Sequence, residues 1–169
     1  LSEEQCRAVR HLWHARDPVM ILRGQAGTGK TTMTKEAVRG IEEAGRSVVM
    51  LAPTAQASRG VLAAEGFAEA TTVAEFLLNE KLQERARGNV VWIDEAGLMP
   101  FRDMTRLAAL AEQLDARIIL AGDRRQHRAV ARGEPLAVLE DLAGLPVAEL
   151  TTIRRQQGAY RKAVERLAR

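Results

Sequence analysis

The feature that most constrains this chain is a glycine-rich segment at residues 24–31, with the sequence GQAGTGKT. It fits the phosphate-loop pattern, in which a glycine and four free positions are followed by Gly-Lys-Ser/Thr. The apolar run 19–22 before it predicts a buried strand, and residues 32–41 after it carry apolar side chains at helical spacing. A strand, a glycine loop and a helix in this order predict a cradle for nucleotide phosphates. A glycine-rich turn that matches by chance is the disfavoured alternative.

The chemistry of the segment defines the ligands that we expect. Its glycines let backbone N–H groups face phosphate oxygens, and the N-terminus of the helix adds partial positive charge. Lys30 would reach the β- and γ-phosphates, and the Thr31 hydroxyl would be a ligand of Mg²⁺, so ATP and Mg²⁺ are the expected cofactors. The nucleotide-binding residues expected here are Gly24, Ala26, Gly27, Thr28, Gly29, Lys30, Thr31 and Thr32.

Composition sets the broad class of protein. With 169 residues, 46% of them hydrophobic, the chain is long enough for one domain with a substantial core. The net charge of +3 is compatible with a nucleic-acid partner and equally with a solvated basic surface. The single cysteine, Cys6, excludes an internal disulfide and favours a cytoplasmic protein. No apolar run is long enough to span a membrane. We expect a piece of a longer protein, because the chain starts at Leu1 and stops within a helical pattern.

The order of elements predicts an α/β fold. Ser2 and Gln5 form a capping-box pattern before a first helix, in which Val9, Leu12 and Trp13 are expected in the core. Thr72 is expected to cap a short helix, with Glu75 in the box position. Further buried strands are predicted at 47–52, 90–93, 117–121 and 147–150, and further helices at 55–62, 104–114 and 136–142. This alternation predicts a mostly parallel sheet of about five strands with helices on both faces, and ligands at the carboxyl edge.

Polar clusters follow three of the predicted strands. Asp94 would hold Mg²⁺ and Glu95 would activate the attacking water, although an acidic pair can also be a helix cap on an exposed loop. Gln126 can hydrogen-bond both a γ-phosphate and that water, or belong to a polar turn. Arg154 and Arg155 follow the last predicted strand, where an arginine can neutralise charge on the transferring phosphoryl group or be an ordinary surface residue. The catalytic candidates are therefore Lys30, Glu95, Gln126 and one arginine of this pair, and the metal ligands are Thr31 and Asp94.

The order of these motifs resembles the first RecA-like motor domain of superfamily 1 DNA helicases of the RecD-like branch. It is most similar to the helicase part of conjugative relaxases of the TraI/TrwC kind. The departures are Leu98 before Met99, His127 where leucine is frequent, and Ala74 where histidine is common. The segments that carry the resemblance are 1–5, 24–31, 51–55, 70–77, 94–99, 120–126 and 150–156.

The resemblance implies further roles. Gln5 would contact adenine, and Arg155 would be the γ-phosphate arginine. The residues implied along the path of single-stranded DNA are Pro53, Thr54, Thr72 and His127. Relatives of this kind are similar in having a second RecA-like domain, which would complete the ATP cleft and is not contained in these 169 residues.

We therefore expect the ATP-binding and ATP-hydrolysing motor domain of a single-stranded-DNA translocase or helicase, from a conjugative plasmid-transfer protein. Alone, this domain should turn ATP over weakly or not at all. Two other classes stay open. One is a nucleotide-gated module that binds DNA or protein without productive hydrolysis, against which Glu95 argues. The other is a phosphotransferase, which would need an acceptor-site lid that the sequence does not offer.

Overall fold

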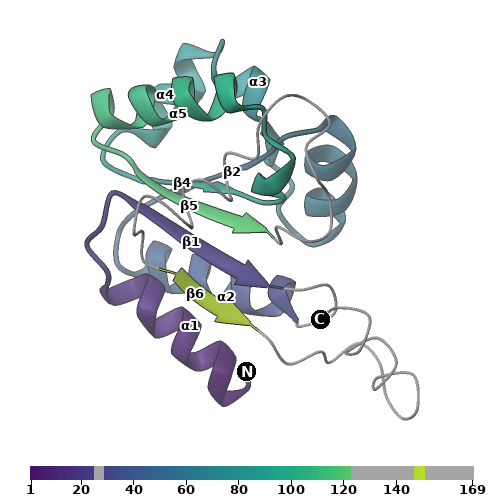
Figure 1. Cartoon of the computed structure of the whole chain (residues 1–169), viewed down its shortest axis with the longest axis vertical. Helices are drawn as coiled ribbons and strands as arrows, with labels where there is room; N and C mark the ends of the chain where they lie inside the picture. Colours follow the sequence, from purple (N-terminus) through teal and green to yellow (C-terminus); the bar gives the residue numbers. More distant parts are fainter. Residues whose placement is uncertain (25–28, 123–146, 151–169) are drawn as a thin grey trace.

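The structure is a computed structural model that describes residues 1–24, 29–122 and 147–150. Six strands form one sheet in the order β3-β2-β4-β5-β1-β6, and every neighbouring pair is parallel. Figure 1 shows the arrowheads of β1, β5 and β6 pointing to the same side. The strands are β1 (Val19–Gly24), β2 (Val48–Ala52), β3 (Thr71–Thr72), β4 (Val90–Ile93), β5 (Arg117–Gly122) and β6 (Val147–Leu150).

Helices cover both faces of the sheet, with α3, α4 and α5 on one side and α1 and α2 on the other (Figure 1). Between Val48 and Ala52 the alternate side chains of β2 enter two separate apolar clusters, one on each face. Strands buried on both faces consist of continuous apolar residues, which is why these runs were recognisable in the sequence. The helices are α1 (Glu3–His14), α2 (Lys30–Glu43), η1 (Gln56–Leu62), α3 (Val73–Phe76), α4 (Glu80–Ala86), η2 (Ala96–Leu98) and α5 (Phe101–Gln113).

The predicted fold class is confirmed, with three elements that the sequence did not predict, namely β3, α4 and the short helix η2. The sheet has six strands because Thr71 and Thr72 pair with the end of β2 before Thr72 caps α3. Helix α4, capped by Asn79, was not predicted at all. The capping box of Ser2 and Gln5 is confirmed.

Trp13 corrects one expectation, because it is 41% exposed and does not lie in the core. Helix α1 buries Val9 and Leu12 and leaves the indole at the edge of its contact with α2. The predicted helix at 136–142 lies outside the described residues. Within the described segments, no helix combines the length and apolarity needed to cross a bilayer.

Candidate functional site

The carboxyl ends of β1 and β4 bring two predicted site residues together. Lys30 is the first residue of α2, directly after the phosphate loop, and Asp94 follows the last residue of β4. The Lys30 ammonium lies 2.6 Å from Asp94 Oδ1, although β5 separates the two strands in the sheet. Their side chains are only 23% and 15% exposed. Opposite charges this close and this shielded from water attract strongly, so each holds the other in place.

A second pair connects the predicted metal ligand to a carboxylate that sequence reasoning missed. Thr31 Oγ1 donates a hydrogen bond to Glu65 Oε1 at 2.7 Å. Both residues are half-buried, and Glu65 follows η1 on the way to β3. The two residues are 34 positions apart, and Glu65 belongs to no motif, so no local pattern could have revealed the contact.

Gln5 joins helix α1 to the end of the phosphate loop. Its side-chain oxygen accepts from Ser2 N–H at 2.9 Å, and its Nε2 donates to the Gly29 carbonyl at 3.2 Å. Gln5 is 4% exposed, and Gly29 has a φ of 78°, a left-handed conformation that suits glycine. Gln5 therefore contacts the end of the phosphate loop directly. Its contact with adenine stays a prediction.

Glu95, the candidate base, has an unusual backbone conformation. Its φ of 53° and ψ of 36° place it in the left-handed region, just before the short helix η2. Asp115 is the other non-glycine residue with positive φ in the described part of the chain. A left-handed conformation costs most residues about 1–2 kcal/mol. The neighbouring Asp94 N–H donates to the Leu51 carbonyl of β2 at 2.9 Å, which anchors the start of this turn to the sheet.

The residues predicted along the DNA path lie after β2 and at β3. Thr54 is exposed and accepts a hydrogen bond from Ala57 N–H at the start of η1, while Pro53 is half-buried. Thr72 Oγ1 accepts from Glu75 N–H at 3.1 Å and caps α3. Because β2 and β3 are parallel neighbours, these residues share one edge of the sheet. Cap and turn chemistry accounts for both threonines, so DNA contact stays a prediction.

The Glu75 carboxylate connects three elements near this edge. It accepts from Thr71 Oγ1 at 2.6 Å and from Arg59 at 2.8 Å. These two partners, the hydroxyl first, hold the pKa of Glu75 below its ordinary value. The contact ties η1, β3 and α3 to one another.

Two more of the predicted nucleotide-binding residues, Gly24 and Thr32, lie within the described residues. Gly24 is buried at the end of β1, and Thr32 is exposed in the first turn of α2. The remaining candidates lie outside the described residues, namely Ala26, Gly27, Thr28, Gln126, His127 and Arg155.

The described residues suit Mg²⁺ bound together with a nucleotide. No group of three or more acidic, histidine or cysteine side chains forms a metal cage within 1–24, 29–122 and 147–150. Mg²⁺ does not need one, because it commonly takes one or two protein oxygens together with phosphate oxygens and water. Asp94, which pairs with Lys30, and Thr31, the next residue of the chain, could provide such oxygens.

The chain is similar to known proteins both in sequence and in fold. A family described as "AAA domain" matches residues 1–169. The chain is 34% identical to a probable conjugal transfer protein TraA of Sinorhizobium fredii over 93% of its own length and 14% of that protein. It is 32% identical to the multifunctional conjugation protein TraI of Escherichia coli K12, covering 97% of the chain and 10% of that protein.

Two further relatives are named as helicases. The ATP-dependent RecD2 DNA helicase of Deinococcus radiodurans is 34% identical over 92% of the chain and 22% of that protein. The crystal structure of Pif1 helicase from Candida albicans superimposes with a TM-score of 0.69 at 19% identity, covering 97% of this chain and 42% of that one. The chain thus spans between a tenth and about a fifth of these three curated relatives.

Proposed function

The chain belongs to the AAA domain family, and from that premise we propose that it is the ATP-driven motor domain of a single-stranded-DNA translocase or helicase, within a conjugative plasmid-transfer protein. The observation that carries the proposal is the 2.6 Å contact between Lys30 and Asp94. This contact supports the proposal, because an ammonium that would bind phosphate and a carboxylate that would bind Mg²⁺ lie within reach of one ligand. The similarity to proteins named for conjugation and helicase activity supports the choice of process.

The ion pair suggests how the site changes when substrate arrives. Without ligand, Lys30 and Asp94 neutralise each other. Bound Mg²⁺-ATP would offer phosphate oxygens to Lys30 and a metal ion to Asp94, and the metal would neutralise charge that develops on the transferred group. Lys30 would then turn toward phosphate oxygens, and Asp94 would turn toward the metal. Each buried charge exchanges one partner for another, so neither is left unpaired.

Thr31 and Glu65 suit the same exchange. The Thr31 hydroxyl donates a hydrogen bond to Glu65, which leaves the lone pairs of Thr31 Oγ1 free for Mg²⁺. A carboxylate behind a metal ligand orients that ligand and makes its oxygen a better donor to the metal. We assign Glu65 as a positioning residue on this basis.

Glu95 is the residue that would activate the attacking water. It directly follows Asp94, so the residue that would hold Mg²⁺ and the base would lie on one short turn. Gln126 would hydrogen-bond the γ-phosphate and the attacking water, and Arg155 would neutralise charge on the γ-phosphate. A second RecA-like domain would form the other side of the cleft. Single-stranded DNA would run along Pro53, Thr54, Thr72 and His127.

Titration of a fluorescent ATP analogue in Mg²⁺ tests the proposal, with the 169-residue chain, Lys30→Ala and Glu95→Gln, each with and without single-stranded DNA. We expect binding by the parent chain, loss of binding in Lys30→Ala, and retained binding without hydrolysis in Glu95→Gln. DNA should change the affinity of the parent chain. Equal binding by the parent chain and Lys30→Ala would remove the phosphate-site assignment. Hydrolysis is compared in the full-length protein, where equal rates with and without Glu95→Gln would remove the assignment of Glu95 as the base.

A further inference from the structure

A cavity of about 730 Å³ lies at the amino edge of the sheet, where β1 and β5 begin. Its walls come from the end of α1, the connection 15–18, the second half of α2 and the start of β5. Figure 1 shows β1 starting on the left of the view and ending on the right. A six-residue strand is about 17 Å long, so this cavity is separate from the proposed nucleotide site.

Three arginines are among the residues that line the cavity, namely Arg16, Arg46 and Arg117. None of the three has an ion-pair partner among the residues that the structure describes. Two carboxylates, Asp17 and Asp115, also line it and leave the wall with a net positive charge. The wall of the cavity therefore carries arginine charges that no carboxylate of the described residues contacts directly.

Among the described residues, Arg117 is the arginine of the cavity that most clearly lacks hydrogen-bond acceptors. Its Nε is buried and has no hydrogen-bond partner within the described segments, and one of its terminal nitrogens contacts Met20 Sδ, a weak acceptor. Burial lowers the pKa of Arg117, and the nearby charge of Arg46 lowers it further, while Asp17 acts in the opposite direction. Arginine stays protonated in proteins, so a half-buried cation is held here with poor acceptors. An anion in the cavity would offset this positive charge through space, although the buried Nε itself would stay without an acceptor among the described residues.

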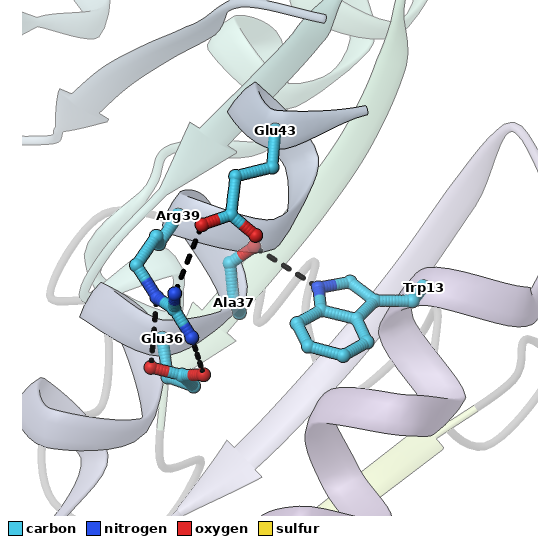
Figure 2. Close-up of polar contacts among 5 residues, drawn as sticks. All are labelled: Trp13, Glu36, Ala37, Arg39 and Glu43. Carbon is cyan, nitrogen blue, oxygen red and sulfur yellow. Dashed lines mark hydrogen bonds and ion pairs between the residues drawn. The ribbon is translucent and has the colours of Figure 1, made fainter. Parts of the chain in front are cut away.

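The cavity also contains a fixed aromatic wall. The Trp13 indole N–H donates to the Ala37 carbonyl at 3.1 Å, as Figure 2 shows. The ring lies over Gly40, where an added Cβ would come within 2.2 Å of Trp13 Cζ2. The indole is 41% exposed, whereas Trp92, the other tryptophan, is fully buried in the sheet. Trp13 is therefore a built-in fluorescent reporter of this cavity.

We propose that this cavity binds the phosphate group of a phosphorylated ligand, held by Arg16, Arg46 and Arg117. A phosphate accepts several hydrogen bonds and carries up to two negative charges, so it matches a cluster of guanidinium forks better than one carboxylate does. The phosphate can come from a free phosphorylated metabolite or from a nucleic-acid backbone. The site is independent of the ATP site and of the function proposed above.

The test is a titration of Lys30→Ala with inorganic phosphate, against potassium chloride at equal ionic strength. The Lys30→Ala background suppresses phosphate binding at the phosphate loop. Trp13 fluorescence and ³¹P line broadening are both recorded. We expect a saturable response to phosphate only. Adding Arg46→Gln, an exposed position, should weaken the apparent affinity by about tenfold, because a charge-assisted hydrogen bond is lost.

The matched control is Arg39→Gln in the same background. Arg39 is another exposed arginine of this region, but it pairs with Glu36 and Glu43 on the outer face of α2, outside the cavity (Figure 2). Its substitution should leave the affinity for phosphate unchanged. An equal loss in Arg39→Gln and Arg46→Gln would overturn the proposal, as would a response that does not saturate or fails to appear in both measurements.

Competition then identifies the source of the phosphate. Glucose 6-phosphate and an oligothymidylate are each added to the phosphate-loaded Lys30→Ala protein. Displacement by the sugar phosphate alone indicates a free phosphorylated metabolite. Displacement by the oligonucleotide at lower phosphate-group concentration indicates a nucleic-acid backbone. Failure of both to displace inorganic phosphate would contradict a site for phosphorylated ligands.

Discussion

At the scale of single residues, the candidate site is a set of polar contacts that are satisfied before any ligand binds. Lys30 pairs with Asp94, Thr31 with Glu65, and Gln5 with the Gly29 carbonyl. Each contact joins segments that are distant in the sequence. The contacts of Thr31 and Gln5 can persist when a ligand binds, so these side chains lose less entropy, whereas Lys30 and Asp94 would exchange their contact for phosphate and metal.

Glu65 gives a prediction at this scale. Glu65→Gln should raise the Mg²⁺ concentration needed for half-maximal binding of an ATP analogue by about tenfold, since loss of a residue that orients a metal ligand typically has an effect of this size. Affinity measured without metal should stay unchanged. The measurement is a Mg²⁺ titration, repeated with Mn²⁺ followed by electron paramagnetic resonance.

Glu69→Gln is the matched control for Glu65, because Glu69 lies nearby in the chain and pairs with exposed Arg85 instead of Thr31. It should leave the dependence on Mg²⁺ as it is. The positioning role of Glu65 is refuted if the two variants respond alike. It is also refuted if Glu65→Gln weakens metal-free binding to the same extent.

Sequence reasoning predicted direct contacts between residues only where the residues are close in sequence, and predicted shared sites from motifs. The bond between Ser2 and Gln5 follows from a pattern with a spacing of three residues. Lys30 and Asp94 were predicted to share a site because each belongs to a motif at a strand end. Glu65 was missed because its partner is 34 positions away and its chemistry depends on how η1 folds back toward α2.

At the scale of elements, the contact between α1 and α2 depends on a glycine. Gly40 leaves space for the Trp13 indole, which is also held by the Ala37 carbonyl. Gly40→Ala should destabilise the protein by about 1–3 kcal/mol, because the ring must move and the packing of the two helices is disturbed. The free energy of unfolding in urea measures this effect.

Gly60→Ala serves as the comparison for Gly40→Ala. Gly60 lies in the helix η1, and an added Cβ there has no neighbour within 4 Å. Alanine at such a position should stabilise the protein by about 0.5–1 kcal/mol. Destabilisation of equal size at both positions would mean that the fit of Trp13 against Gly40 is not what limits Gly40→Ala.

The elements that were predictable are those with a strong apolar pattern. The strand Val90–Ile93 was predicted with its observed bounds, since all four of its residues are buried. Helix α4 was missed because Ala86 is its only buried residue, which leaves almost no amphipathic signal. Strand β3 was missed because its two residues form a strand only by pairing with β2.

At the scale of the whole molecule, the parallel sheet gathers all the strand ends at one edge, where the described part of the site lies. Half of the proposed cleft is expected from another domain. The 169-residue chain should therefore bind nucleotide but hydrolyse it roughly 10³–10⁵-fold more slowly than the full-length protein with single-stranded DNA, the factor that one arginine finger can supply.

Steady-state ATPase measurements on the chain alone and on the full-length protein test this expectation. Lys30→Ala in both proteins defines the background rate. Turnover by the isolated chain at the rate of the full-length protein would show that no second domain contributes to the chemistry. The site and the fold would then be sufficient by themselves, contrary to the proposed function.

The left-handed backbone at Glu95 has a consequence for how this sequence can change over generations. Glycine would fit that conformation without strain, and asparagine would fit it better than a long side chain does. Drift under selection for stability alone should therefore move this position away from glutamate. Asp115, with a similar φ, is under less pressure, since aspartate tolerates this conformation well. A glutamate that persists at position 95 records selection for chemistry against the preference of the fold.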